Sequence, residues 1–320
     1  MTDVSVIIAA FKAQDYVHKA IASALSQEGV DLEVIVVDDA SPDDTAEAAR
    51  MAGRSDPRLK VIRQEINGGP SIARNTAIAS AKGRYVAVLD ADDSFAPQRL
   101  SQLVRVADET QADIIVDNIQ RVDGQGQAIE DHYFLSAPAF AQRHDIDLAT
   151  YIRNNRMFSK LPALGYLKPL FKTETLKKHG VEYDPSLRNS EDYYLVADLL
   201  ACGARMVFEP IAGYLYQVEA GSISHRLTPE LTSKLVNAAK RFELRHRAEL
   251  NSDAFLAAKA HTRRLKHAHT FVSIVDHLKA KQFLAVLGAL IQQPDAFGFV
   301  VSQLAGILIE KVTKKQTVAA

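Results

Sequence analysis

The sequence predicts an α/β fold: a doubly wound, mostly parallel sheet flanked by helices, followed by a helical region at the carboxyl end. Three observations support this prediction. Short segments rich in valine and isoleucine alternate with helical segments over the first 118 residues. Acidic side chains stand at the ends of two of these short segments, and after residue 228 the pattern changes to long helical segments. Strand–helix alternation of this kind is typical of parallel sheets with right-handed crossovers.

Hydrophobic spacing places the elements of the first 118 residues. Buried strands are expected at 4–10, 32–39, 60–64, 84–90 and 113–118. Helices are expected at 14–27, 42–52, 70–82 and 97–110. The second of these helices has a clear start signal, because Ser41 stands at the N-cap, Pro42 at the first helical position and Asp44 in the first turn.

The pattern is weaker between residues 119 and 165. The segment GQGQAIEDHY indicates a loop or hairpin, and 146–155 indicates a short helix. A helix follows at 186–203, where Ser190 is the expected N-cap, and residues 205–218 are strand-like.

The totals describe an ordinary globular protein. At 320 residues the chain can hold one large α/β domain, expected at 1–228, and a helical appendage, expected at 229–320. The composition is 47% hydrophobic and 24% charged, which excludes a disordered or fibrous chain. A net charge of −1 gives no indication of nucleic-acid binding, and a single cysteine excludes an internal disulfide framework.

The sequence also indicates a compartment. The first residues, MTDVSVIIAAF, lack the basic region of a signal peptide. No uninterrupted apolar run approaches the roughly 20 residues that a spanning helix needs. We therefore expect a cytoplasmic protein.

Two acidic clusters fall at the carboxyl ends of expected strands, where open α/β sheets bind ligands. Asp38 and Asp39 complete the strand at 32–39 and precede the helix cap, so the cap does not explain them. A carboxylate at this place accepts hydrogen bonds from a base edge or a ribose. These two residues are therefore candidates for nucleoside binding.

The second cluster is Asp90-Ala91-Asp92-Asp93. In an extended chain residues i and i+2 project to one side, so Asp90 and Asp92 are expected to face one site together. Two carboxylates with room for water and phosphate oxygens suit Mg²⁺ or Mn²⁺. Asp93 and Ser94 have the alternative role of starting the helix near Pro97.

A third candidate lies at the start of the helix at 70–82. Asn67, Gly68 and Gly69 form a flexible turn before Pro70, and Arg74 falls in the first turns of the helix. A helix N-terminus with a cation suits a diphosphate, although a solvated arginine on a helix face is an equal alternative. Neither G-x-G-x-x-G nor the P-loop pattern occurs, so a dinucleotide fold and a P-loop are not supported.

Four motifs in order resemble family 2 of the inverting glycosyltransferases, which have the GT-A fold. They are VSVIIAAF, EVIVVDDASPDDT, NGGPSIARNTAIASAKGRYVAVLDADD and NSEDYYL, and they cover roughly residues 3 to 225. Each motif alone is loose, but together they are specific. Where many members read IIPAYN, this chain has Ala9, Ala10, Phe11 and Lys12, which changes the base-stacking position.

The resemblance implies roles for individual residues. Asp39 would contact a uracil-type base and Asp90 would lie near the ribose. Asp92, the second aspartate of the D-x-D motif around Ala91, would hold the metal that bridges the diphosphate. Asp192 matches the position of the catalytic base, with Glu191 as the alternative.

The acidic pair and a nearby histidine also fit ordinary structural roles. A helix capped by Ser190 would place Glu191 and Asp192 in its positive first turn, where acids need no catalytic role. His225 is a further candidate for a metal or phosphate contact, but a lone histidine after a strand is more often a surface residue.

The region 229–320 carries two apolar runs, FLAVLGALI and FGFVVSQLAGILI, beside basic helices. They could lie on an anionic membrane surface, pack on the catalytic domain or join a second subunit. Family members that build surface polysaccharides often use lipid-linked acceptors, so peripheral membrane contact is one hypothesis.

These observations predict a metal-dependent inverting glycosyltransferase that moves a sugar from a UDP-sugar to a hydroxyl of a glycan or lipid-linked glycan, in bacterial polysaccharide synthesis. A catalytically silent nucleotide-sugar-binding or scaffold protein on the same fold is the alternative. An aspartyl phosphatase is rejected, because its nucleophile is expected on the first strand, which here ends in IIAAF.

Overall fold

The computed structural model describes residues 2–159, 162–218 and 227–306. The chain divides into two compact units. Among the described residues, the first unit holds 2–154 and 162–218, and the second holds 155–159 and 227–306. The sequence did not indicate that the short segment 155–159 packs within the second unit.

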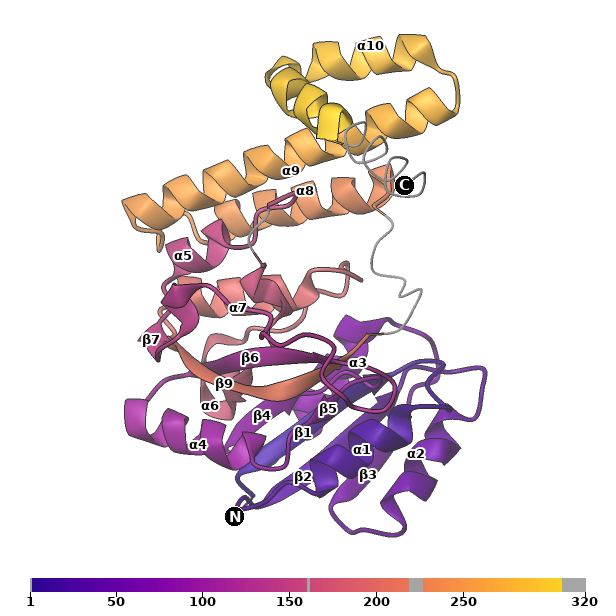
Figure 1. Ribbon diagram of the computed structural model, residues 1–320, viewed down its shortest axis with the longest axis vertical. Coiled ribbons are helices and arrows are strands. Elements are labelled where there is room, and N and C mark those ends of the chain that lie inside the picture. The colour runs from indigo at the N-terminus through magenta and orange to yellow at the C-terminus, as the bar shows by residue number, and fades with distance from the viewer. Residues whose placement is uncertain (1, 160–161, 219–226, 307–320) are drawn as a thin grey trace. The chain divides into compact units, whose positions relative to one another are not determined.

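The first unit is built on one mixed sheet (Figure 1). Its strands among the described residues are β1 (Val4–Ala10), β2 (Leu32–Asp38), β3 (Leu59–Arg63), β4 (Tyr85–Val88), β5 (Ser94–Phe95), β6 (Ile114–Val122), β7 (His144–Asp145), β8 (Leu170–Lys172) and β9 (Met206–Gln217). Their order is β3-β2-β1-β4-β8-β6-β9-β5, and β7 pairs with β9.

Half of this sheet has the predicted parallel arrangement. β1 pairs in parallel with β2 and β4, and β2 pairs in parallel with β3. These strands are rich in valine and isoleucine because both faces of β1 and β2 are buried. The short strand β8 is inserted antiparallel between β4 and β6. β8 has only three residues and follows a proline, so its sequence pattern is too short to be recognised as a strand.

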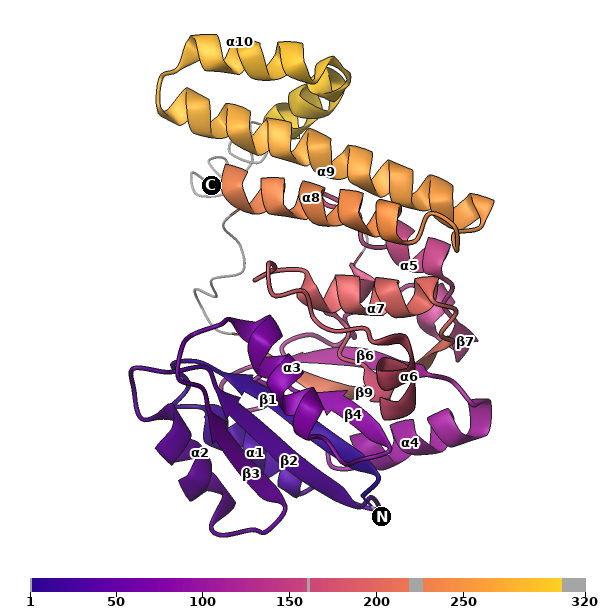
Figure 2. The ribbon, with the colours of Figure 1, turned by 180° about the vertical axis from the view of Figure 1, so that it is seen from behind.

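Helices cover the sheet of the first unit. Those that the structure describes are α1 (Val17–Leu25), α2 (Thr45–Gly53), α3 (Pro70–Ser80), α4 (Arg99–Thr110), α5 (Leu148–Arg153), α6 (Thr173–His179) and α7 (Glu191–Ala201), with 3-10 turns at Pro138–Phe140 and Leu164–Tyr166. Right-handed crossovers place α1 and α2 on one face and α3 on the other, as the two opposite views show (Figures 1 and 2). The helices expected at 14–27, 42–52, 70–82 and 97–110 are thus present with shifted ends.

Two predicted helix caps are wrong. α2 begins at Thr45 rather than at Pro42, and the Ser41 side chain instead accepts a hydrogen bond from the Lys12 N–H. Ser190 stands before α7 but has a φ of 63° and caps no N–H, and its hydroxyl donates to Asn189. In both places the local turn uses the serine for another hydrogen bond, which sequence spacing does not reveal.

The second unit is helical, as expected. It contains α8 (Pro229–Arg245), α9 (Ser252–Lys279), α10 (Phe283–Gln292) and a helical segment at Pro294–Gly306 that opens with a 3-10 turn. The side chains of Thr228 and Asn251 cap α8 and α9. Within this unit the ring of Phe158 packs edge-on against Phe271, which explains why 155–159 belongs here.

No single described helix is long and apolar enough to cross a membrane. α10 and the segment 294–306 meet the requirement of length and composition only together, and they meet at an angle of 102°.

Candidate active site

The two aspartates that follow or end β2 hold the next loop in place through hydrogen bonds and an ion pair. Asp38 is fully buried, where one carboxylate oxygen accepts the Ser41 N–H and the other lies 3.4 Å from Nε of Arg63. Its side chain therefore has no exposed surface for a nucleotide, and the structure places Asp38 in the support of the loop.

Asp39 joins this loop to the start of α3. Its two carboxylate oxygens accept the N–H groups of Gly68 and Gly69 at 2.7 and 2.8 Å, and the Asn67 side chain donates to its carbonyl. Each carboxylate oxygen has a second lone pair, so Asp39 retains acceptor capacity for a base. Gly69 has φ +86° and ψ 173°, a conformation essentially limited to glycine, which explains the glycine at this turn.

The end of β1 lies beside this loop. Ala10 pairs with Asp38 in the parallel register, so Phe11 follows directly at the mouth of the sheet. Its ring is exposed, and Ala9 before it is only half-buried. The structure thus brings Ala9, Phe11 and Asp39 to one edge.

Behind this edge lies a cluster of buried ionic groups. Arg74 reaches Asp90 and Glu191 at 2.8 Å each, and its Nη1 lies 3.5 Å from Asp192. Lys168 reaches Asp90 at 2.7 Å and Asp192 at 2.8 Å. Two cations therefore bind three carboxylates that are separated by about a hundred residues of sequence, which is why spacing did not predict the network.

The members come from four separate segments of the chain. Arg74 lies in the first turns of α3, Asp90 follows β4, and Glu191 and Asp192 open α7. Lys168 stands just before β8, in the apolar run LGYLKPLF. Sequence reasoning missed Lys168. Its only signal is its place within an otherwise apolar segment, because a lysine in a buried segment is usually paired with an acidic group.

The backbone at Lys168 is held by a second buried ion pair. Arg99 donates to Asp117 at 2.7 Å, and both side chains are fully buried. The same guanidinium donates to the Lys168 carbonyl at 2.6 Å, and Asp117 also accepts the Gly213 N–H. Arg99 therefore connects α4 to the segment that carries Lys168.

The cluster keeps its members charged. Burial opposes ionisation of Asp192, but Arg74 and Lys168 outweigh it and lower the pKa of Asp192 below its usual range. Burial also opposes protonation of Lys168, yet Asp192 and Asp90 raise the pKa of Lys168 above its ordinary value. Burial and the charge of Asp192 raise the pKa of the Tyr183 phenol, whose ring lies 5.3 Å from the Arg74 guanidinium. Asp192 is therefore a largely buried carboxylate, 14% exposed, that is ionised at neutral pH.

The geometry of the D-x-D segment differs from the prediction. Residues 90–93 form a turn in which the Asp93 N–H donates to the Asp90 carbonyl, so Asp90 and Asp92 do not lie on one face of an extended strand. Asp90 faces the two cations, whereas Asp92 is exposed. The expected common face of Asp90 and Asp92 is therefore wrong, because β4 ends at Val88.

Asp93 does not begin a helix either. It is buried and accepts hydrogen bonds from the Tyr214 hydroxyl at 2.7 Å and the Gln217 N–H at 2.8 Å. Burial together with the negative charges of Asp90 and Asp92 raises the pKa of Asp93 well above its ordinary value. Asp93 thus fastens the turn to β9 and leaves Asp92 at the surface.

These positions allow a test of the expected metal. Among the described residues no group of three or more His, Cys, Asp or Glu side chains forms a metal site. Mg²⁺, however, is usually bound by one or two carboxylates plus substrate phosphates and water. The exposed Asp92 fits this limited role, whereas Asp90 is bound by Arg74 and Lys168. His225 lies outside the described residues.

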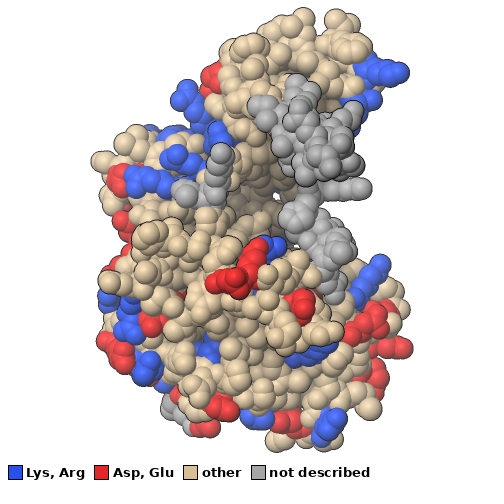
Figure 3. All heavy atoms as spheres, in the orientation of Figure 1, with Lys and Arg blue, Asp and Glu red and all other residues tan. Residues whose placement is uncertain are grey.

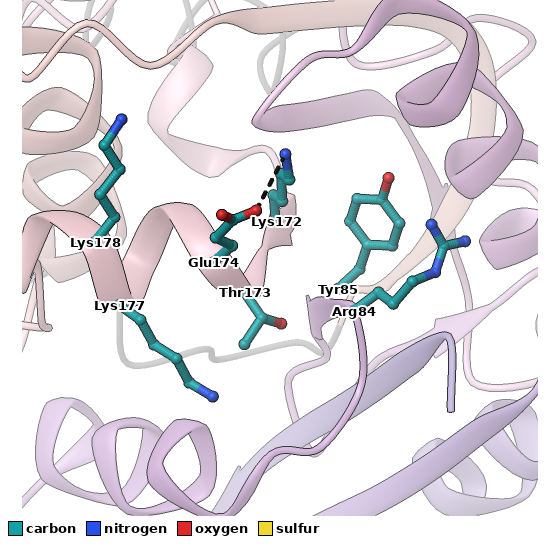
Figure 4. A pocket seen from close by; sticks show the side chains of 7 residues that line it. All are labelled: Arg84, Tyr85, Lys172, Thr173, Glu174, Lys177 and Lys178. Carbon is teal, nitrogen blue, oxygen red and sulfur yellow. Dashed lines mark ion pairs between the residues drawn. The ribbon is translucent and has the colours of Figure 1, made fainter. Parts of the chain in front are cut away.

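A separate basic pocket, shown in Figure 4, lies at the amino end of β4. It has a volume of about 590 Å³ and is lined by Arg84, Tyr85, Lys172, Thr173, Glu174, Lys177 and Lys178. Arg84 pairs with Asp108 and Lys172 with Glu174, while Lys177 and Lys178 point away from each other. Tyr85 begins β4, so the pocket is far along the strand from Asp90 and is not part of this site.

Solved structures share the fold. S. aureus TarS 1–349, in complex with UDP, aligns with a TM-score of 0.64 at 21% identity over 98% of this chain and 88% of that one. The mannosyltransferase PcManGT from Pyrobaculum calidifontis, in complex with GDP-Man and Mn²⁺, aligns with a TM-score of 0.58 at 18% identity over 94% of this chain and 84% of that one. At these identities the similarity shows the fold alone.

Sequence relatives show the family. The family model described as Glycosyl transferase family 2 matches residues 5–165. The succinoglycan biosynthesis protein ExoO of Rhizobium meliloti (strain 1021) is 37% identical over 297 residues, which cover 92% of this chain and 82% of that protein. The resemblance found in the motifs is thus confirmed, and the chain belongs to family 2 of the glycosyltransferases, enzymes that transfer a sugar, with the GT-A fold.

Proposed function

We propose that this glycosyltransferase moves a sugar from a UDP-sugar to a hydroxyl of a glycan acceptor, with inversion at the anomeric carbon and with help from Mg²⁺ or Mn²⁺. The observation that carries this proposal is the ionised, largely buried Asp192, held by Lys168 and Arg74 at the carboxyl ends of the strands. The similarity to ExoO supports a role in bacterial polysaccharide synthesis, and the UDP complex of TarS supports the nucleotide.

The mouth of the sheet would bind the nucleotide. The exposed Phe11 ring offers a stacking surface, and Asp39 offers acceptor capacity on a carboxylate already fixed by Gly68 and Gly69. Because the backbone N–H groups of Gly68 and Gly69 already fix the Asp39 carboxylate, this side chain loses little conformational entropy when a base binds. Asp90, whose side chain is 26% exposed, would face the ribose.

Asp92 would hold the divalent cation, together with diphosphate oxygens and water. When bound, such a cation supplies positive charge that stabilises the leaving diphosphate. The Mn²⁺ complex of PcManGT supports this assignment. The chain itself contributes an exposed carboxylate on a turn that Asp93 fastens to β9.

Asp192 would act as the general base. One of its oxygens accepts a hydrogen bond from Lys168 at 2.8 Å, and Nη1 of Arg74 lies 3.5 Å from the other. An acceptor hydroxyl would donate its proton to this carboxylate while its oxygen forms the new bond to the anomeric carbon and the bond to the diphosphate breaks. Base assistance of this kind is worth about 10²–10⁴ in rate. A single displacement inverts the anomeric centre.

Calorimetry tests the nucleotide and metal assignments. UDP is expected to bind wild-type protein more tightly with Mn²⁺ than without it, and Asp92→Ala should remove the Mn²⁺ dependence. Asp113→Ala, which removes a carboxylate away from this site, is the control. Absence of UDP binding under every metal condition would contradict the choice of nucleotide.

An assay of sugar transfer tests the assignment of Asp192 as the general base. Asp192→Asn keeps the size of the side chain but removes its basicity, so it should lose about 10²-fold or more in kcat while binding UDP and Mn²⁺ like wild type. Proton NMR of the product should show the anomeric configuration opposite to that of the donor. A retained configuration would contradict the single displacement.

A further inference from the structure

One helix of the second unit is apolar on two faces. On one face of α10, Val286, Ala289 and Leu290 pack against the core that includes Phe271 and Phe299. This contact explains how α10 is held within the second unit. It leaves the other face without a partner among the described residues.

The other face of α10 exposes large apolar side chains. Phe283, Leu284, Leu287 and Ile291 are 68%, 87%, 56% and 70% exposed. Their spacing of three and four residues places them along one stripe of the helix. Phe297 and Val301, four residues apart in the following helical segment, are also exposed. Contiguous exposed apolar surface of this kind marks an interaction site, unlike scattered single residues.

Charge is absent from this surface and present at its edge. Between Gln282 and Gly306 the only charged residue is Asp295, which is bound by Arg263 and His267. Lys279 and Lys281 directly precede α10 and are exposed. In the space-filling view the atoms over α10 are mostly uncharged, with basic atoms at one end (Figure 3).

The shape of this segment decides how it meets a lipid layer. α10 and the segment 294–306 together have the length and composition of a spanning helix, but they are bent by 102°. A pair bent so sharply does not cross a bilayer as one straight helix. Its apolar stripe and flanking lysines are instead typical of helices that lie in the plane of the interface.

We propose that α10 and the segment 294–306 bind the surface of an anionic lipid bilayer, with the side chains of Phe283, Leu284, Leu287 and Ile291 inserted between the lipids. Lys279 and Lys281 then face the negative headgroups, which attract basic residues near the surface. A protein partner fits less well, because protein interfaces carry about one hydrogen bond per 100–200 Å² and this stripe has no polar side chain. The proposal rests on this surface and not on the proposed sugar chemistry.

Sedimentation with vesicles tests the proposal. The full chain is mixed at low salt with vesicles of phosphatidylcholine alone or with added phosphatidylglycerol, without any substrate. We expect the wild-type chain to sediment with the anionic vesicles and to be released by 0.5 M NaCl, as for electrostatically assisted binding. The double variant Leu284→Gln, Ile291→Gln should bind about tenfold less or weaker still, because it removes two inserted apolar side chains.

A matched control separates this surface from apolar exposure in general. Leu244 on α8 is 75% exposed but lies outside the stripe, so Leu244→Gln should bind vesicles like wild type. Circular dichroism and thermal unfolding establish that both variants are folded. If the double variant and wild type bind equally, or if wild type ignores anionic vesicles, the proposal is wrong.

Light scattering tests the alternative that a second copy of this chain covers the apolar stripe of α10. A wild-type dimer that Leu284→Gln, Ile291→Gln converts to a monomer, without vesicle binding by either, would show that a second copy covers the stripe and would overturn the proposal. Since no donor or acceptor is present, neither outcome depends on the sugar-transfer reaction.

Discussion

At the scale of single residues, Lys168 connects the two ends of the site. It touches Asp90, which faces the proposed ribose position, and Asp192, the proposed base. One ammonium group thereby fixes the direction of both carboxylates. An Asp192 that was free to rotate would lose the alignment on which proton transfer depends.

The charge of Lys168 should therefore appear in the pH dependence of transfer. Removing a cation favours the protonated form of a nearby carboxylate, so Lys168→Met raises the pKa of Asp192. A larger fraction of Asp192 is then protonated at low pH, and the acidic limb of the kcat/KM profile should move to higher pH. The profile measured from pH 4 to pH 9 checks this.

Two controls accompany that profile. Lys168→Arg keeps the charge and should restore the position of the acidic limb, even where its altered shape lowers kcat. Lys172→Met alters a nearby lysine that pairs with Glu174 outside the site and should leave the profile unchanged. An unmoved limb in Lys168→Met would mean that the lysine does not act on the base.

The turn before α3 depends on one glycine. Gly69 occupies a backbone conformation that other residues adopt at a cost of about 1–3 kcal/mol. Gly69→Ala should therefore lower the free energy of unfolding by about that amount and weaken UDP binding, because the Asp39 carboxylate loses its fixed N–H partners. Urea unfolding and calorimetry measure the two effects. Gly288→Ala, in α10 where a new methyl group meets nothing, should not destabilise the protein.

At the scale of elements, α4 supports the segment that carries Lys168. Its Arg99 bridges Asp117 on β6 and the Lys168 carbonyl before β8. A buried ion pair adds little stability compared with an apolar pair, but the loss of one partner leaves a buried charge alone. The pair therefore restricts where β6, β8 and α4 can lie.

Replacement of this arginine should be costly. Arg99→Met leaves Asp117 charged and buried, and we expect it to lower the free energy of unfolding by about 3–5 kcal/mol. Arg105→Met on the same helix removes an exposed arginine that lies 3.7 Å from Glu109. It should change the free energy of unfolding by less than about 0.5 kcal/mol. Urea unfolding of both variants gives the comparison, and equal effects would contradict a special role for Arg99.

At the scale of the whole molecule, the ionic cluster makes stability depend on pH. Burial disfavours ionised Asp90 and Asp192, but Lys168 and Arg74 lower both pKa values in the folded protein. Groups with a depressed folded pKa stabilise the protein above their unfolded pKa, which is about 3.9 for aspartate, and this stabilisation is lost as the pH falls further. Asp93, whose folded pKa is raised, acts in the opposite direction.

Acid unfolding should reveal this balance. The free energy of unfolding from urea curves should fall between pH 5 and pH 3, and Asp90→Asn, Asp192→Asn should show a smaller fall over that interval. Glu174→Gln, which changes an exposed carboxylate, should follow wild type. If the double variant keeps the full wild-type slope, the acid sensitivity arises elsewhere.

Much of the fold and part of the site could be predicted without coordinates. The strands β1, β2 and β4 were recognisable because buried parallel strands are near-continuous apolar runs rich in valine and isoleucine. The Asp39 and Asp92 positions were recognisable because acidic residues follow such strands. The caps at Ser41 and Ser190 were predicted wrongly, since a serine before a helix has several local hydrogen bonds open to it.

The sequence by itself determined the alternation of elements, the acidic strand ends and the family, because each of these is a property of residues close together in the chain. Only the tertiary structure decided that Arg74, Asp90, Lys168 and Asp192 form one network and that Asp92 stands apart from Asp90. It also decided which face of α10 is covered. These facts depend on contacts between distant segments, and the energy of a buried charge depends on what surrounds it in space.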